Sequence, residues 1–222
     1  PKYIFHTAAV PLAKIDNLNA KETKEGSIDT TVNILECVNE FQKKHKSNLQ
    51  RFVYISSSMV YGDFKKKTAS EEDICEPIEL YGKMKLSGEI ITKGLCKFFK
   101  IKYSIIRPSA VYGPTDMNNR VSQIFIEKAL KGEEITIQGK KESLDFTYVE
   151  DLVNGIILSA TKKGGINETF NITRGKAEKL VSFVKILAAR IKNIKIKIVT
   201  RDSFRPVRGT LSVKKAKKLL NY

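Results

Sequence analysis

The sequence predicts an α/β fold built on a parallel sheet with helices on both faces. Short apolar segments alternate with helix-length amphipathic segments through the first half of the chain, in the order strand, helix, strand, helix, strand. That order is typical of right-handed crossover connections between parallel strands. The chain has 222 residues, of which 41% are hydrophobic, which is enough for one or two compact domains with a sizeable core.

The elements of the first half follow from two hydrophobic periodicities. Runs of aromatic and β-branched residues predict strands, and apolar residues repeated at helical spacing, such as Val32, Leu35 and Val38, predict helices. The expected elements, in chain order, are a strand at Tyr3–Phe5, a helix at Glu22–Phe41, a strand at Phe52–Ile55, a helix at Tyr81–Phe99 and a strand at Tyr103–Ile106.

After Pro114 the alternation loosens and predicts a smaller α+β lobe that packs closely on the sheet, since no long linker or repeat is visible. The expected elements there are helices at Val121–Leu130, Val149–Thr161, Leu180–Ile191 and from Val213 onward, with strands at Glu134–Ile137, Asp145–Tyr148, Thr169–Ile172 and Lys195–Thr200.

Composition excludes several classes of protein. No apolar run approaches the roughly 20 residues that span a bilayer, and no leader-like segment is visible, so we expect a cytoplasmic protein without a membrane partner. Cys37, Cys75 and Cys96 are odd in number and widely spaced, which predicts idle thiols and no metal site. The net charge of +16 is spread over the chain without a basic stripe. A solvated lysine-rich surface, or attraction of an anionic small molecule, is favoured over nucleic-acid binding.

The start of the chain predicts that a segment precedes it. The first expected strand begins almost at Pro1, which would leave an unpaired sheet edge, and no G-x-G-x-x-G phosphate loop occurs. We expect the later part of a longer chain that lacks its first phosphate-binding section and binds a dinucleotide poorly by itself.

A tyrosine and a lysine stand one helical turn apart in the expected helix at Tyr81–Phe99. Tyr81 and Lys85, at i and i+4, project from one face, and a nearby ammonium favours the phenolate form of a tyrosine. Tyr61 and Lys65 have the same spacing, but Gly62 between them predicts a turn. The expected strand at Phe52–Ile55 runs into three serines at its carboxyl end, where ligands of open α/β sheets bind.

Several segments, taken together, resemble one family. They are residues 4–9 (Ile-Phe-His-Thr-Ala-Ala), 33–36 (Asn-Ile-Leu-Glu), 52–62, 81–85 (Tyr-Gly-Lys-Met-Lys), 107–114 (Arg-Pro-Ser-Ala-Val-Tyr-Gly-Pro), 145–151 (Asp-Phe-Thr-Tyr-Val-Glu-Asp) and 214–220. In their order and spacing they resemble the extended short-chain dehydrogenase/reductase family of nucleotide-sugar epimerases and dehydratases, and in particular enzymes similar to UDP-glucose 4-epimerase. The resemblance implies a Rossmann-type doubly wound sheet without its N-terminal part.

The resemblance also implies a cofactor, site residues and a division of the chain. The cofactor would be NAD, with NADP left open, and the catalytic residues would be Ser57, Tyr81 and Lys85, with Lys85 lowering the pKa of Tyr81. The residues expected to bind the cofactor are Ala8, Ala9, Ser56, Tyr81, Lys85, Pro108 and Ser109. Residues 1–114 would form the cofactor domain, and residues 115–222 would form mainly the substrate lobe, with elements around 140–165 returning to the core. His6 is expected to be a buried structural histidine.

The expected reaction is 4-epimerisation of a nucleotide-diphosphate sugar through a transient 4-keto sugar. Dehydration is disfavoured because Ser58 and Met59 stand where the family's dehydratases carry an Asp-Glu pair. A phosphate-binding arginine of many relatives is replaced by Leu144. The residues expected to bind substrate are Ser58, Ala110, Arg120, Arg205 and Arg208. Alternatives are an NAD(P)H-dependent reductase or dehydrogenase of a keto sugar or other ketone, and a non-catalytic dinucleotide- or RNA-binding module. The resemblance further implies a homodimer through a four-helix interface.

Overall fold

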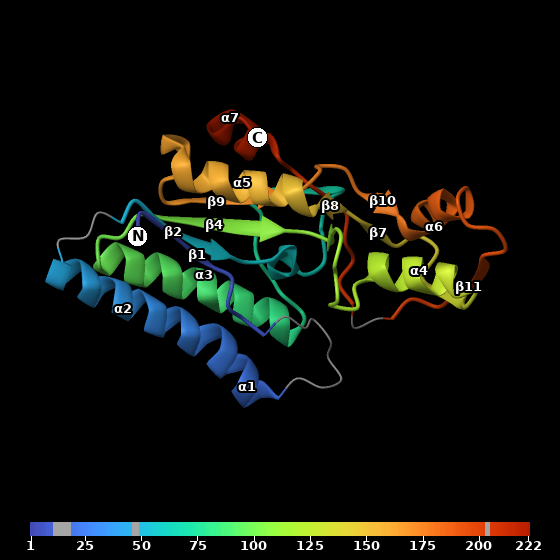
Figure 1. Cartoon of the computed structure of the whole chain (residues 1–222), viewed down its shortest axis with the longest axis horizontal. Helices are drawn as coiled ribbons and strands as arrows, with labels where there is room; N and C mark the ends of the chain where they lie inside the picture. The colour runs from blue at the N-terminus through green and yellow to red at the C-terminus, as the bar shows by residue number, and fades with distance from the viewer. Residues whose placement is uncertain (11–18, 46–48, 203–204) are drawn as a thin grey trace.

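A four-stranded parallel sheet forms the centre of the molecule (Figure 1). The computed structural model describes residues 1–10, 19–45, 49–202 and 205–222. The sheet has the strand order β1-β2-β4-β9, and each neighbouring pair is parallel. Its strands are β1 (Tyr3–His6), β2 (Arg51–Ile55), β4 (Tyr103–Pro108) and β9 (Glu168–Ile172). The predicted α/β class and parallel sheet are therefore confirmed.

Helices cover both faces of this sheet (Figure 1). One face carries α2 (Thr30–His45) and α3 (Leu80–Phe98), and the other carries α5 (Val149–Thr161) and α7 (Lys214–Leu220). The single helix predicted at Glu22–Phe41 is divided into α1 (Ala20–Lys24), a π-helical turn (Glu25–Asp29) and α2.

The alternation of side chains along β2 builds the two apolar layers. Phe52 and Tyr54 pack in a cluster with residues of α2 and α3, whereas Val53 packs in a cluster with residues of α5 and α7. Successive strand residues point to opposite faces, so a run of apolar residues can be buried on both sides. Gly88 of α3 allows the helix to approach closely, since a Cβ there would lie 2.0 Å from the Tyr54 hydroxyl.

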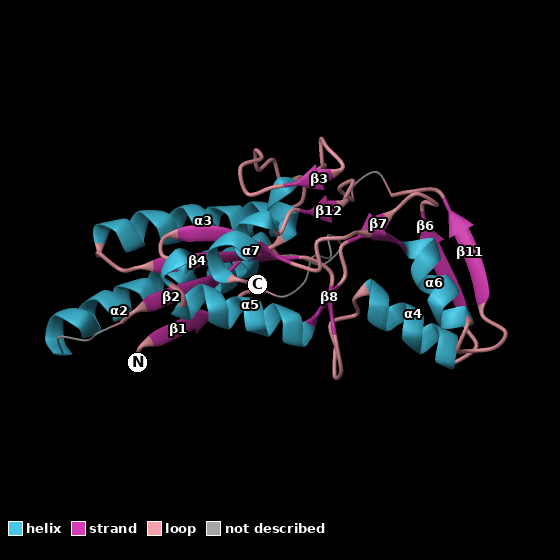
Figure 2. Cartoon of the chain, turned by 90° about the horizontal axis from the view of Figure 1, so that it is seen from above, coloured by secondary structure: helices cyan, strands magenta, loops and turns pink. Residues whose placement is uncertain are grey.

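A third apolar cluster lies beyond the carboxyl ends of the central strands (Figure 2). It includes Phe125, Ile135, Ile137 and Val184. The elements there are α4 (Val121–Leu130), β6 (Glu134–Gln138), α6 (Leu180–Ala188) and β11 (Lys195–Val199), and β6 pairs with β11 in parallel. Helix α6 ends before the predicted Ile191.

Short strands connect the two regions. Their bounds are β3 (Thr68–Ala69), β5 (Val111–Tyr112), β7 (Ser143–Leu144), β8 (Thr147–Tyr148), β10 (Glu178–Lys179) and β12 (Thr210–Leu211). The strand predicted at Asp145–Tyr148 is interrupted, because Asp145 is fully buried and its carboxylate accepts hydrogen bonds from the Leu211 amide and the Thr173 hydroxyl. Although β9, α5 and α7 come late in the sequence, they complete the central sheet and its cover.

Two predictions about the surface and the thiols can be compared with the structure. Within the ranges that the structure describes, no helix is long and apolar enough to cross a membrane. The three cysteines are free thiols, with Cys37 exposed, Cys75 half-buried and Cys96 buried. The same ranges contain no group of His, Cys, Asp or Glu side chains suited to a metal ion.

Candidate active site

A cavity of about 450 Å³ lies where the carboxyl ends of β1, β2 and β4 meet the N-terminal half of α3. Ser57, Tyr81 and Lys85 all line it. The strand β2 ends at Ile55, so the serines that follow it project into the space between the sheet and α3. Parallel strands place their carboxyl ends on one edge of a sheet, which is the usual position of a ligand site in open α/β folds.

The three residues singled out from the sequence form one polar group. The Ser57 side chain lies close enough to Tyr81 to lower the pKa of its phenol as a hydrogen-bond partner. The Lys85 ammonium donates to the Ile55 carbonyl over 2.8 Å, and its Nζ lies 5.8 Å from the centroid of the Tyr81 ring. The i,i+4 spacing on α3 therefore brings the lysine and the tyrosine together, while the serine comes from the end of β2.

Burial controls the acidity of these groups. It lowers the pKa of Lys85 to about 8, against the opposing effect of the Glu89 carboxylate. It also raises the pKa of Tyr81, and the opposing effects come from the Ser57 hydrogen bond and the charges of Arg120 and Arg208. The structure thus differs from the prediction that Lys85 lowers the pKa of Tyr81, because desolvation of the phenolate outweighs the neighbouring charges.

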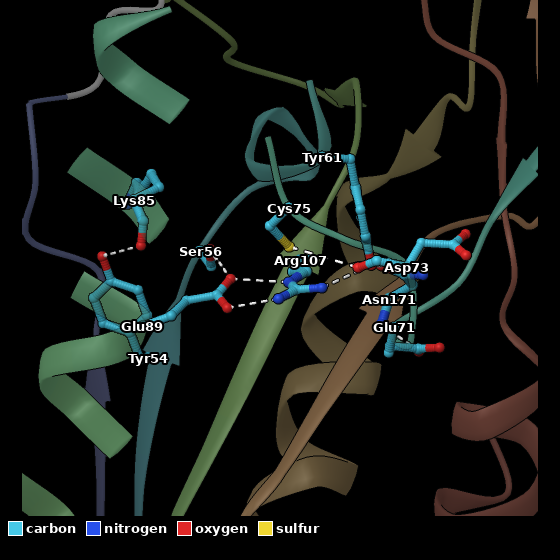
Figure 3. A network of polar contacts seen from close by, with 10 residues as sticks. All are labelled: Tyr54, Ser56, Tyr61, Glu71, Asp73, Cys75, Lys85, Glu89, Arg107 and Asn171. Carbon is cyan, nitrogen blue, oxygen red and sulfur yellow. Dashed lines mark hydrogen bonds and ion pairs between the residues drawn. The ribbon is translucent and has the colours of Figure 1, made fainter. Parts of the chain in front are cut away.

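A buried ion pair between Glu89 and Arg107 contacts Ser56, which lines the cavity (Figure 3). Glu89 receives two hydrogen bonds from Arg107, at 2.9 and 2.7 Å, and one from the Ser56 hydroxyl at 2.5 Å. The relative exposures of the Glu89 and Arg107 side chains are only 1% and 4%. Arg107 also donates to the Tyr61 hydroxyl, which in turn donates to the Asn171 side chain of β9. One charged network therefore links α3 to β4, to β9 and to the segment that follows β2.

Sequence reasoning missed this ion pair, although a signal was present. Glu89 lies one turn after Lys85 on the same helix, and Arg107 lies in a segment otherwise predicted to be a buried strand. Opposite charges at two positions that should be buried indicate a pair. The network also explains the second Tyr-x-x-x-Lys match, since Tyr61 belongs to it, whereas the exposed Lys65 pairs with Glu76 at 3.5 Å.

Most residues expected at the cofactor site line the cavity, and one does not. Ala9, Ser56, Pro108 and Ser109 are among its lining residues. Ala8 is exposed and is not among them, so the structure does not support its expected place beside a cofactor. Strand β1 ends at His6, and Thr7, Ala9 and Val10 of the segment that follows line the cavity.

The expected substrate residues divide in the same way. Ser58, Ala110, Arg120 and Arg208 line the cavity. Arg205 is exposed and does not line it. Its Nε lies 3.5 Å from the carboxylate of Asp202, a nearby residue of the same loop. Asn118 and Asn119 were not among the expected site residues, but they also line the cavity next to Arg120.

His6 is a structural histidine, as predicted. Its Nε2 lies 3.0 Å from the Thr31 hydroxyl of α2, and the residue is 6% exposed. Burial, helped by the charge of Lys85, lowers the pKa of His6 to about 4. The imidazole is therefore neutral at neutral pH and packs between β1 and α2.

Comparison with known proteins identifies the family. Residues 1–173 match the model of the NAD dependent epimerase/dehydratase family. The uncharacterized UDP-glucose epimerase YtcB of Bacillus subtilis is 31% identical over 99% of this chain and 68% of its own length. The uncharacterized protein MJ1055 of Methanocaldococcus jannaschii is 32% identical over 86% of this chain and 59% of its own length, so the chain spans less than two thirds of that relative.

Solved structures agree with the sequence relatives. UDP-glucuronic acid 4-epimerase from Bacillus cereus, in complex with UDP-glucuronic acid and NAD, is 27% identical with a TM-score of 0.87, and the match covers 100% of this chain and 69% of that one. UDP-glucose 4-epimerase from Thermotoga maritima is 27% identical with a TM-score of 0.89, covering 100% and 72%. The chain belongs to the NAD-dependent epimerase/dehydratase family.

Proposed function

We propose that the protein is an NAD-dependent nucleotide-sugar 4-epimerase and that Ser57, Tyr81 and Lys85 perform its acid–base chemistry. The observation that carries the proposal is that these three side chains line one cavity at the strand ends, where the Lys85 Nζ lies 5.8 Å from the centroid of the Tyr81 ring. The solved structures of a UDP-glucose 4-epimerase and a UDP-glucuronic acid 4-epimerase, which match the whole of this chain, support it.

The residues of the cavity fit a nicotinamide cofactor. The recorded hydrogen bond of the Lys85 ammonium, to the Ile55 carbonyl, leaves further N–H donors for the hydroxyls of a ribose. Ala9 presents only a methyl group and allows a dinucleotide to approach the backbone, and Pro108 and Ser109 form the wall at the end of β4. When bound, NAD supplies the acceptor, and then the donor, of the hydride.

The chain's own residues handle the proton. Tyr81, as phenolate, takes the proton of the sugar 4-hydroxyl while the Ser57 hydroxyl holds the oxygen, and the C4 hydrogen leaves as hydride to give a 4-keto sugar. After the ketone presents its other face, hydride returns to C4 and Tyr81 returns the proton to the oxygen. Ser57, Arg120 and Arg208 favour the phenolate against the burial that raises the pKa of Tyr81.

The test is a product assay with purified protein, NAD and a UDP-sugar. We expect interconversion of the two C4 epimers without net change in the absorbance of reduced nicotinamide, whereas a reductase would consume the reduced cofactor. Tyr81→Phe should lower the rate about 10²–10⁴-fold, the usual contribution of a positioned acid–base group. Tyr112→Phe is the matched control, since Tyr112 is more exposed and does not line the cavity. Equal rates for the wild type and Tyr81→Phe would exclude the proposed mechanism.

We also propose a homodimer through α2 and α3, as the resemblance implies. These helices lie side by side on one face (Figure 1), and apolar Phe41, Ile90 and Phe98 are 45%, 63% and 79% exposed on them. Large exposed apolar side chains indicate an interface. Ile90→Glu should convert a dimer into a monomer in light scattering, and an unchanged mass would contradict this arrangement. The expected cytoplasmic location stays a prediction.

A further inference from the structure

Glu89 is a buried acid that does not line the cavity but contacts a residue that does. Its carboxylate accepts one hydrogen bond from the Ser56 hydroxyl and two from the Arg107 guanidinium (Figure 3). The Ser56 amide in turn donates to the Ile106 carbonyl of β4 over 2.7 Å. The carboxylate is therefore held on two sides, by an arginine and by a serine that is itself attached to the sheet.

The end of β2 fixes Glu89 and Lys85 relative to each other. The Lys85 ammonium donates to the Ile55 carbonyl over 2.8 Å, and the Glu89 carboxylate accepts from the Ser56 hydroxyl over 2.5 Å. Ile55 and Ser56 are consecutive in the chain, and Lys85 and Glu89 stand one turn apart on α3. The lysine carbonyl also accepts a bond from the Tyr54 hydroxyl over 3.4 Å. A cation and an anion from one helix face thus bind neighbouring residues of one strand end.

The groups that face Lys85 leave Glu89 as its source of negative charge. His6 of β1 is neutral at neutral pH. The rings of Tyr54 on β2 and Tyr81 on α3 lie 5.6 and 5.8 Å from the Lys85 Nζ, and burial raises the pKa of both hydroxyls, which disfavours their charged forms. Among the residues that the structure describes, Glu89 is the charged group that opposes the burial of the Lys85 ammonium.

We propose that Glu89 is a positioning residue of the active site: held by Arg107 and Ser56, its carboxylate is the fixed counter-charge that keeps the Lys85 ammonium charged. This inference rests on the proposed function of Lys85. A charged lysine has three N–H donors, so that two remain for a cofactor ribose beside the bond to Ile55, whereas a neutral amine has one donor fewer. An ion pair that only stabilised the fold could be replaced by apolar side chains without this effect.

The test uses a double change that separates stability from function. Glu89→Met with Arg107→Met leaves no buried charge, so much of the stability should remain, but the counter-charge of Lys85 is lost. The first measurement is the NMR chemical shift of the Lys85 Cε against pH, in protein labelled at the lysine Cε, with the signal assigned by Lys85→Met. We expect the titration midpoint to fall by about one pH unit, the low end of the shift that a nearby opposite charge causes. Glu76→Gln, a change in an exposed carboxylate outside the cavity, should leave the midpoint as in the wild type.

The second measurement is the pH profile of kcat/KM in the epimerase assay. The decline at high pH should move to lower pH by the same amount as the NMR midpoint. If the pKa of Lys85 falls by one unit from about 8, the charged fraction at pH 8 is about fivefold lower, and kcat/KM should fall by the same factor. The single change Glu89→Gln should shift the midpoint in the same direction.

The outcomes separate this inference from the proposed function. A wild-type midpoint in the double variant would overturn the inference, because the pair would then only stabilise the fold. A lowered midpoint with an unmoved kcat/KM profile would also overturn it, since the reaction would not depend on the charge of Lys85. If the wild type epimerises no sugar, the proposed function fails and the NMR titration alone decides: a lowered midpoint supports the counter-charge, and an unmoved one overturns it.

Discussion

Glu89→Gln should destabilise the protein more than its position outside the cavity suggests. The substitution removes the negative charge from a pair whose side chains are 1% and 4% exposed, and it leaves the Arg107 guanidinium buried without a counter-charge. Removing one partner of a buried ion pair typically costs about 3–5 kcal/mol. The bond from the Ser56 hydroxyl, 2.5 Å long, would also lose its charged acceptor. We therefore expect a loss near the middle of that range.

The assay is urea unfolding at neutral pH, followed by circular dichroism. The matched control is Glu76→Gln, since the ion pair of Glu76 with Lys65 has side chains 60% and 74% exposed and such surface pairs contribute about 0–1 kcal/mol. The double change Glu89→Met with Arg107→Met should recover much of the loss, because it leaves no buried charge. If Glu89→Gln costs no more than the control, the reasoning about the buried pair is refuted.

Three further predictions concern α3 and β1. Gly88→Ala should destabilise the fold by about 1–3 kcal/mol in the same urea assay, because the new Cβ would meet the Tyr54 hydroxyl. Gly94→Ala on the same helix should stabilise the fold by about 0.5–1 kcal/mol, because a Cβ there would have no neighbour within 4 Å. The opposite order of stabilities would contradict the packing of α3 on β2. Burial lowers the pKa of His6 from 6.5 to about 4 in the folded protein, so between these two pH values the imidazole is protonated in the unfolded chain and neutral in the folded one. The free energy of unfolding should therefore fall by about 3 kcal/mol as the pH drops from 6.5 to 4. His6→Asn should flatten this part of the pH dependence, and parallel curves would count against it. Because the pKa of Lys85 is about 8, this side chain loses its charge and kcat/KM should decline as the pH rises through 8. In Lys85→Arg the decline should move to higher pH, since arginine keeps its charge. If the decline stays at the same pH in Lys85→Arg, another group causes it.

Local sequence patterns predicted much of the central sheet and of the candidate site. The strands at 3–6, 51–55 and 103–108 and the helix at 80–98 follow from periodicity, because burial on one or both faces leaves a repeat that is visible within a few residues. The spacing of Tyr81 and Lys85 predicted their shared face for the same reason. The sequence therefore predicts the position of a residue when its contacts in the fold are with residues close to it in the chain.

Tertiary structure alone decided the contacts between distant segments. Arg205 and Arg208 looked equivalent in the sequence, yet only Arg208 reaches the cavity, where it meets serines 150 and 99 positions away. The pairing of Glu89 with Arg107 likewise joins a helix to a strand. Such contacts depend on how helices and strands pack against one another, which leaves no periodic trace, and the desolvation that raises the pKa of Tyr81 and lowers that of Lys85 exists only once those segments have come together.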